Sequence, residues 1–158
     1  MVAPFLVKNF RRSHRKTEDA LGIAREAFSN IAARFPALEI VENRGEPVEI
    51  SLTLPKQAGL KFDVRLALQN GDELHFSVGH LWMEWFPCTD APVADSYVEA
   101  VTGFLSGEYR VLEYWQGGTC AKAKLQKPRG EGWRTVATWG AGSFRLPWGR
   151  SLREIRNR

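Results

Sequence analysis

Residues 80–87 read HLWMEWFP and place five large apolar side chains within the six positions 81–86. In a β-strand, alternate side chains point to opposite faces. Apolar groups would then lie on both faces: Leu81, Met83 and Trp85 on one, Trp82, Glu84 and Phe86 on the other. Both sides of this segment must therefore be covered, either by the rest of the chain or by a molecule that binds it.

Two amphipathic helices are predicted from the three- and four-residue spacing of apolar side chains. The first is expected to start at an N-cap residue, Thr17, and to end before Pro36. The second is expected to open at Asp90, with Pro92 just inside it, and to end at Ser106-Gly107. Their predicted buried faces are Leu21, Ala24, Phe28, Ile31 and Phe35 in the first helix and Val93, Tyr97, Val101, Phe104 and Leu105 in the second.

Antiparallel strands are predicted between these helices, because apolar and polar residues alternate over 48–54 and 61–68. A three-residue hairpin loop at 69–71, with Gly71 in the left-handed conformation, sets apolar residues opposite one another. The resulting pairs are Leu66 with Leu74, Val64 with Phe76 and Phe62 with Val78. The same reasoning assigns 43–45 to the first hairpin loop and pairs Ile40 with Val48.

The second half of the chain is expected to form three more strands, at about 108–115, 119–126 and 133–139. Gly117 and Gly118 join the first two. A two-residue turn there places Glu113 opposite Lys122, whereas a three-residue loop places it opposite Ala121. The sequence leaves both registers open.

Together these elements predict a single α+β domain, with an antiparallel sheet of about seven strands and two main helices packed on one face, in the order α-β4-α-β3. Residues 1–16 are assigned to a basic N-terminal arm, 17–140 to the α+β domain and 141–158 to a basic irregular tail. The tail also allows a short helix near 152–155. The order of elements is similar to that of small secretion-chaperone domains, a likeness that rests on element order alone.

Composition and charge limit the classes of function. The chain is 44% hydrophobic and 25% charged, as in ordinary globular proteins. Its net charge of +4 comes from its two ends: residues 1–16 carry +5 and residues 145–158 carry +4, whereas the remainder sums to −5. Without a membrane span or an export signal we expect a cytoplasmic location, and there Cys88 and Cys120 should be free thiols.

Catalytic and metal-binding patterns are weak. His80, Glu84 and Cys88 have the i, i+4, i+8 spacing of ligands on one helix face, with His75 nearby. Pro87 disfavours the continuous helix that would bring them together. Neither cysteine lies in a nucleophile motif. We therefore assign no catalytic residue, no metal and no cofactor, and expect a protein that is not an enzyme.

Aromatic residues supply the main indication of function. The six tryptophans and nine phenylalanines exceed what the predicted sheet can hide, and Trp133 and Trp139 share strand parity, so both should face the same side. We expect a non-enzymatic interaction module, chaperone-like or dimerising, that binds another protein or a second copy of itself through an aromatic surface. Its predicted binding residues are Trp82, Trp85, Phe86, His80, Glu84, Trp133 and Trp139.

Two alternative functions stay open. One is a small-molecule pocket between sheet and helices, lined by Trp and Tyr, with His80 or Glu84 as its polar anchor. The other is nucleic-acid binding through the basic arms, which would combine phosphate attraction with base stacking. The residues assigned to it are Arg11, Arg12, Arg15, Lys16, Arg150 and Arg153. No membrane partner is expected.

Overall fold

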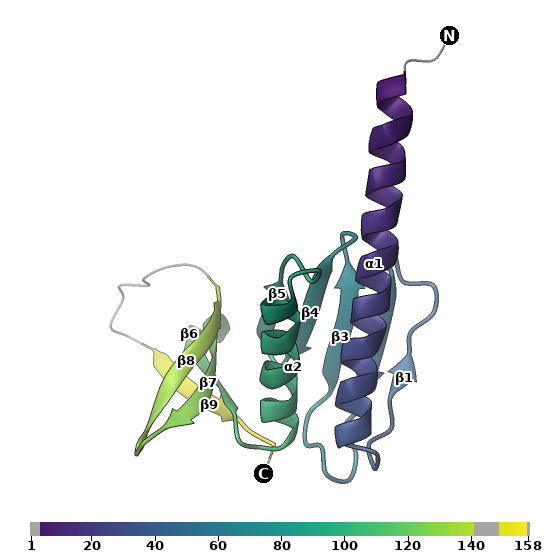
Figure 1. Cartoon of the computed structure of the whole chain (residues 1–158). Coiled ribbons are helices and arrows are strands. Elements are labelled where there is room, and N and C mark those ends of the chain that lie inside the picture. Colours follow the sequence, from purple (N-terminus) through teal and green to yellow (C-terminus); the bar gives the residue numbers. More distant parts are fainter. Residues whose placement is uncertain (1–3, 141–148, 158) are drawn as a thin grey trace.

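The computed structural model describes the backbone of residues 4–140 and 149–157 and the side chains of 17–140 and 149–157. As predicted, the fold is α+β and its sheets are antiparallel (Figure 1). The helices are α1 (Pro4–Arg34) and α2 (Ala91–Leu105). One sheet has the order β1-β2-β3-β4-β5, with β1 (Val41–Glu42), β2 (Ile50–Leu54), β3 (Val64–Gln69), β4 (Glu73–Val78) and β5 (Leu81–Trp85). The other has the order β8-β7-β6-β9, with β6 (Arg110–Gln116), β7 (Thr119–Arg129), β8 (Gly132–Trp139) and β9 (Arg150–Ile155).

Both helices lie on one face of the five-stranded sheet and pack against each other (Figure 1). The predicted buried faces of the two helices form much of the core: Phe28 and Ile31 of α1 and Tyr97 and Phe104 of α2 are buried. The boundaries of α2 are confirmed, because Asp90 is its N-cap and a proline follows in its first turn.

The predicted start of α1 is wrong. The helix begins at Pro4, and Thr17 lies in its interior. Residues 5–16 contain neither Gly nor Pro, and a proline is tolerated in the first turn, so nothing in the sequence interrupts the helix there. The N-terminal part of α1 extends past the edge of the sheet (Figure 1).

The run at 80–87 forms β5 and its flanks, at one edge of the five-stranded sheet. Leu81 is fully buried, and Met83 and Trp85 pack against the core on the helix side. Trp82 lies opposite Ser77 and Glu84 opposite His75, so both face the other side of the sheet. The alternation predicted for a strand is therefore confirmed.

The predicted hairpin registers need correction. Leu66 pairs with Phe76 rather than with Leu74, because the three-residue loop is 70–72 and not 69–71. Gly71 has a positive φ as predicted, and so does Asn70. This slide of two residues keeps every side chain on its predicted face, so face parity alone cannot detect it.

The first hairpin differs more strongly from prediction. Val41 pairs with Thr53, and Ile40 does not pair with Val48. Asn43 lies in the ladder instead of the turn, because its side-chain amide donates to the Ser51 hydroxyl at 3.0 Å and to the Thr53 hydroxyl at 2.8 Å. The loop that follows is consequently longer than three residues.

The last four strands form a separate sheet, so the prediction of one sheet of about seven strands is wrong. Arg150–Ile155 is the strand β9 and not a short helix. Ile155 lies opposite Val111 of β6, and both are fully or almost fully buried. A six-residue segment has no helical preference strong enough to compete with this long-range pairing. Trp148, like the rest of 141–148, lies outside the described residues.

Two β-bulges determine which side chains point to each face of the four-stranded sheet. The Gly117-Gly118 turn has two residues, but a bulge between Tyr114 and Trp115 moves Glu113 opposite Ala123, which neither predicted register allowed. A second bulge lies opposite Leu125–Gln126. It reverses the parity of β8, and Trp133 and Trp139 therefore lie on opposite faces, contrary to prediction.

The two sheets share one hydrophobic core. Val111, Leu125 and Ile155 of the second sheet belong to the same buried cluster as the strands and helices of the first. Near the C-terminus, the Asn157 side-chain amide donates to the carbonyls of Leu105 and Gly59. No helix that the structure describes is long and apolar enough to cross a lipid bilayer.

Candidate functional site

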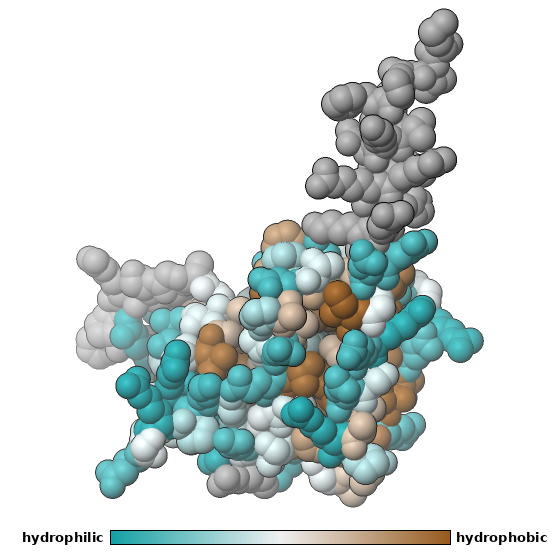
Figure 2. Space-filling model, viewed as in Figure 1, coloured by the Kyte–Doolittle hydropathy of each residue, from teal (hydrophilic) through white to brown (hydrophobic). Residues whose placement is uncertain are grey.

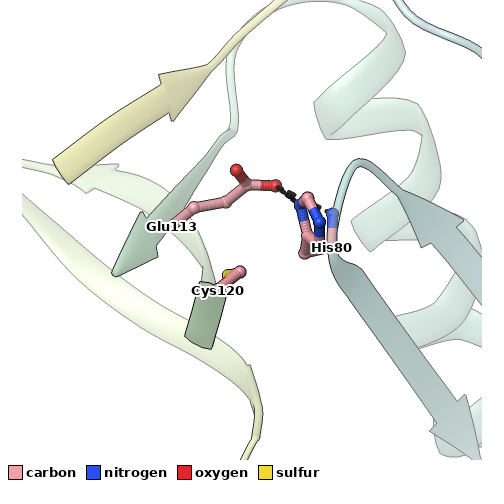
Figure 3. A group of neighbouring side chains, drawn as sticks. All are labelled: His80, Glu113 and Cys120. Atoms are coloured by element: carbon pink, nitrogen blue, oxygen red, sulfur yellow. Dashed lines mark hydrogen bonds and ion pairs between the residues drawn. The ribbon is translucent and has the colours of Figure 1, made fainter. Parts of the chain in front are cut away.

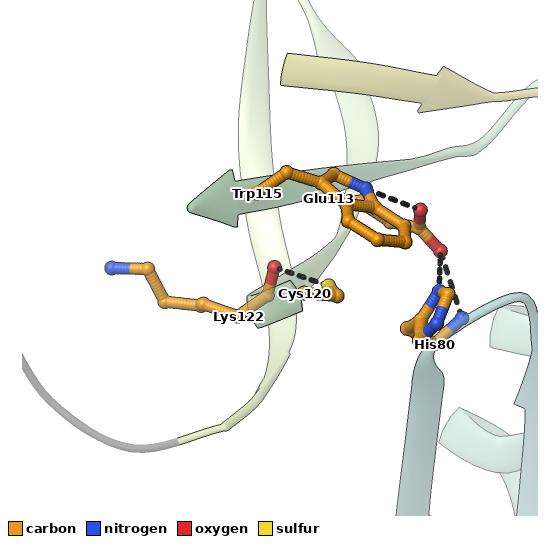
Figure 4. Close-up of polar contacts among 5 residues, drawn as sticks. All are labelled: His80, Glu113, Trp115, Cys120 and Lys122. Carbon is orange, nitrogen blue, oxygen red and sulfur yellow. Dashed lines mark hydrogen bonds and ion pairs between the residues drawn. The ribbon is translucent and has the colours of Figure 1, made fainter. Parts of the chain in front are cut away.

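A buried carboxylate joins the two sheets. Glu113 of β6 has no exposed surface. Its Oε1 accepts hydrogen bonds from the backbone amide of His80 at 2.8 Å and from His80 Nδ1 at 3.0 Å, and its Oε2 accepts from the indole Nε1 of Trp115 at 2.9 Å (Figure 4). Because His80 lies in the turn between β4 and β5, two of these bonds cross from one sheet to the other.

A glycine allows this close approach. Gly79 has a φ of +56°, and a Cβ added there would lie 2.3 Å from Ile155 Cδ1 and 2.6 Å from Glu113 Oε1. Those distances are far below van der Waals contact, so a larger residue would push the turn away from β6. The Gly79-His80 turn therefore fits against Glu113 only because residue 79 has no side chain.

Cys120 is the third chemically distinctive residue here (Figure 3). It lies in β7 opposite Trp115 and donates a weak hydrogen bond to the Lys122 carbonyl at 3.4 Å. Burial raises the pKa of the Cys120 thiol, and the nearby negative charge of Glu113 raises it further. The thiol is therefore protonated at neutral pH, which makes it a poor nucleophile.

The metal-ligand spacing in the sequence does not correspond to a cluster in space. His80 contacts Glu113, whereas Glu84 lies opposite His75. Cys88 is buried, and its backbone amide donates to the Asp72 carbonyl. The side chains that do gather are two other sets: His80, Glu113 and Cys120, and Glu73, His75 and Glu84.

The face of the five-stranded sheet that α1 and α2 leave uncovered carries a hollow of about 230 Å³. Its floor includes the small residues Ser51, Ala67 and Ser77, and Trp82 stands at one side. His75 also lines it, with its ring 4.8 Å from that of Trp82. His75 is only 3% exposed, and within the described part of the chain its Nδ1 has no hydrogen-bond partner.

The predicted aromatic binding residues are distributed over different surfaces. Trp82 and Phe86 are 45% and 56% exposed. Trp85 packs edge-on against Tyr97, and Trp139 packs against the core. Trp133 lies on the outer face of the four-stranded sheet. The structure therefore brings Trp82 and Glu84 onto one surface and separates both from the tryptophans of β8.

Two aromatic rings on that outer face are each in contact with two cations. The Trp133 ring has the guanidinium groups of Arg110 and Arg156 at 4.1 and 4.9 Å. The Tyr114 ring has the ammonium groups of Lys122 and Lys124 at 5.1 and 5.3 Å. The sequence places Lys122 and Lys124 in a basic patch with Trp133 alongside. It does not predict the contacts with Tyr114, Arg110 and Arg156, because both bulges had to be known before these residues could be placed on one face.

The residues predicted for nucleic-acid binding are only partly described. Arg150 and Arg153 are exposed in β9, opposite Gln116 and Glu113. Arg11, Arg12, Arg15 and Lys16 belong to the helical backbone of α1, and their side chains lie outside the described residues.

A larger hollow of about 680 Å³ lies between α1, α2 and the start of β6. Unlike the predicted small-molecule pocket, it is lined by neither tryptophan nor His80 nor Glu84. Glu99 on its wall accepts hydrogen bonds from the Tyr109 hydroxyl and from Lys127, and these lower the pKa of Glu99. Hydrophobic residues on this helix side form separate spots in a mainly hydrophilic surface (Figure 2).

Replacing Glu113 by Ala should lower the free energy of unfolding by about 3 kcal/mol, because three buried or half-buried donors lose their acceptor. The matched control is Glu154→Ala in the neighbouring strand, where the carboxylate is 43% exposed and pairs with Arg110. This control should change stability by less than about 1 kcal/mol. Urea denaturation measures both, and equal losses would contradict the assigned role of Glu113.

No protein-family model matches the chain, and neither the curated proteins nor the solved structures include a significant match. Three features of the described residues are therefore candidates for function: the carboxylate junction of Glu113, the uncovered face of the five-stranded sheet, and the outer face of the four-stranded sheet.

Proposed function

We propose that this protein is a non-enzymatic interaction module that binds a partner protein on the uncovered face of its five-stranded sheet. The observation that carries the proposal is the 45% exposure of Trp82 on that face, and Phe86, just after β5, is 56% exposed. Half-exposed indoles are favoured at protein interfaces, where they supply large contact area for little lost side-chain freedom.

The shape of this face supports binding of a protruding side chain. Small residues form the floor of the 230 Å³ hollow, while Trp82 stands on one side and Glu46 and Val48 of the loop after β1 stand on the other. This volume is small for a typical ligand pocket, whose range begins at roughly 300 Å³. It suits a single side chain of a partner protein better than a whole small molecule.

The polar groups of the hollow favour a partner that also donates a hydrogen bond. The Nε2 atom of His75 contacts Glu73 Oε2 at 3.2 Å. When Nε2 carries the proton, Nδ1 is a buried acceptor that faces no donor in the described part of the chain. A buried acceptor without a donor is unfavourable by about 1–3 kcal/mol, and a partner donor would remove that penalty.

The partner is another protein or a second copy of this chain. In either case Trp82 should be the main anchor of the contact, because it borders the hollow, whose lining also includes polar residues such as Ser51, Arg65 and Ser77. Interfaces with this arrangement, an aromatic anchor inside a polar rim, concentrate their binding energy in the anchor.

Trp82→Ala should weaken association about 10- to 100-fold, as loss of a central aromatic anchor does. Sedimentation velocity measures self-association directly. If the partner is another protein, a photoreactive residue incorporated in place of Glu84 crosslinks and identifies it. Titration with the purified partner then gives the affinity. Circular dichroism shows whether the variant remains folded.

Leu152→Ala is the matched control, because Leu152 is 64% exposed but belongs to β9 of the other sheet. This substitution should leave the affinity within a factor of about two. Equal weakening by both substitutions, or normal binding by a folded Trp82→Ala variant, would contradict the proposal.

A second candidate function, binding of single-stranded nucleic acid, is favoured by the outer face of the four-stranded sheet. The four cations near Tyr114 and Trp133, two per ring, offer contacts for phosphate, and a base could stack on either ring where it displaces a cation onto the phosphates. Within this face Glu154 pairs with Arg110 and partly offsets its charge. This candidate moves the nucleic-acid interface from the basic arms to the sheet.

The double substitution Lys122→Glu and Lys124→Glu should weaken binding of a labelled single-stranded oligonucleotide at least tenfold. It should also reduce the slope of log affinity against log salt concentration by the amount expected for about two lost phosphate contacts. Fluorescence anisotropy at several salt concentrations measures both. The control is Lys56→Glu with Lys61→Glu, an equal charge change at exposed sites outside this sheet. An equal loss of affinity in the control would show that the effect comes from net charge and not from this face, and would contradict this candidate function.

A further inference from the structure

We infer that His80, Glu113 and Cys120 form a binding site for a transition-metal ion, with Zn²⁺ the best match. One ring nitrogen of His80, one carboxylate oxygen of Glu113 and the Sγ atom of Cys120 all lie within 4.8 Å of one another (Figure 3). They come from three different segments: the turn between β4 and β5, the strand β6 and the strand β7. The site is distinct from both surfaces proposed for partner binding.

The distances fit metal coordination after a small movement. Tetrahedral zinc holds nitrogen and oxygen ligands at about 2.0–2.1 Å and sulfur at about 2.3 Å, which places ligand atoms roughly 3.3–3.7 Å apart. Nδ1 of His80 and Oε1 of Glu113 are already 3.0 Å apart. The thiol must approach by about an ångström. Cys120 lies two residues from the Gly117-Gly118 turn, where the chain can adjust.

The electrostatics of the junction favour a cation. Glu113 is fully buried, and among the described residues its ion-pair partner is His80 alone. Arg153 lies opposite Glu113 in the sheet, but its side chain is exposed. A buried carboxylate costs several kcal/mol unless its charge is compensated, and the one ionisable side chain that contacts Glu113 among the described residues is half exposed. A divalent ion bound here would offset this charge.

The donor set selects the type of metal. Thiolate, imidazole and carboxylate together suit zinc and related transition ions, whereas Mg²⁺ and Ca²⁺ prefer oxygen donors. Coordination replaces the thiol proton of Cys120, which is released to solvent, and shifts the ring proton of His80 from Nδ1 to Nε2 so that Nδ1 can bind the ion. The His80 side chain is 45% exposed, which leaves the ion a route from solvent and a fourth position for water.

The direct test is a titration of the full-length, chelator-treated protein with Co²⁺, which replaces zinc and reports its ligands by visible absorption. A bound thiolate adds an intense sulfur-to-cobalt charge-transfer band. We expect this band in the wild-type protein, and we expect added Zn²⁺ to remove it by displacing Co²⁺. Zn²⁺ should also raise the melting temperature, because the ion binds the folded chain preferentially.

Matched variants assign the ligands. Cys120→Ser should lose the charge-transfer band, whereas Cys88→Ser, which removes the other buried cysteine, should keep it. His80→Ala should weaken Co²⁺ binding at least tenfold, and His75→Ala, in the Glu73–His75–Glu84 cluster, should not. His80 is half exposed, so its variant remains informative even if Cys120→Ser folds poorly.

Three results would overturn the inference. The first is the absence of a charge-transfer band in the wild-type protein at millimolar Co²⁺. The second is a band that persists in Cys120→Ser or disappears in Cys88→Ser. The third is metal binding that depends on His75 but not on His80, which would place the ion among the oxygen donors of the five-stranded sheet.

Discussion

The buried carboxylate of Glu113 is the contact on which the joint between the two sheets depends. It receives the backbone amide and the ring of His80 from one sheet and the indole of Trp115 from its own. Charged hydrogen bonds inside a protein are strong, but they stabilise only if the buried charge keeps all its partners. The turn at Gly79 must therefore hold one position against β6.

This joint determines which surfaces remain free. The helices cover one face of the five-stranded sheet, and the inner face of the four-stranded sheet closes the shared core through Val111, Leu125 and Ile155. Each sheet consequently keeps one face outside the core. The two faces differ in chemistry: the first carries an exposed indole beside a small hollow, and the second carries aromatic rings in contact with cations.

Local patterns in the sequence were sufficient for part of the fold. Capping residues and apolar spacing located α2, and alternation placed Trp82 and Glu84 on the face opposite Leu81. The register of β3 and β4 could not be predicted, because a slide of two residues keeps every side chain on the same face. The first hairpin could not be predicted either, because Asn43 is held against β2 by side-chain hydrogen bonds that the apolar periodicity does not indicate.

The candidate site was harder to predict than the helices, because it consists of long-range contacts. Glu113 is separated from His80 by 33 residues, and a bulge sets its final register. One local indication existed: Glu113 shares strand parity with the apolar residues Val111 and Trp115, so it would be buried if that face of the strand were the inner one. That pattern indicates a buried charge that needs partners, but it does not identify them.

Hydrogen exchange at the His80 amide tests the account of the joint most directly. His80 lies in a tight turn and its side chain is half exposed, so its amide would ordinarily be expected to exchange rapidly. Because it donates to Glu113, the account predicts protection comparable to that of the core amides of β6, and loss of that protection in Glu113→Ala, which removes the acceptor. Exchange at the rate of an open turn in the wild-type protein would contradict it.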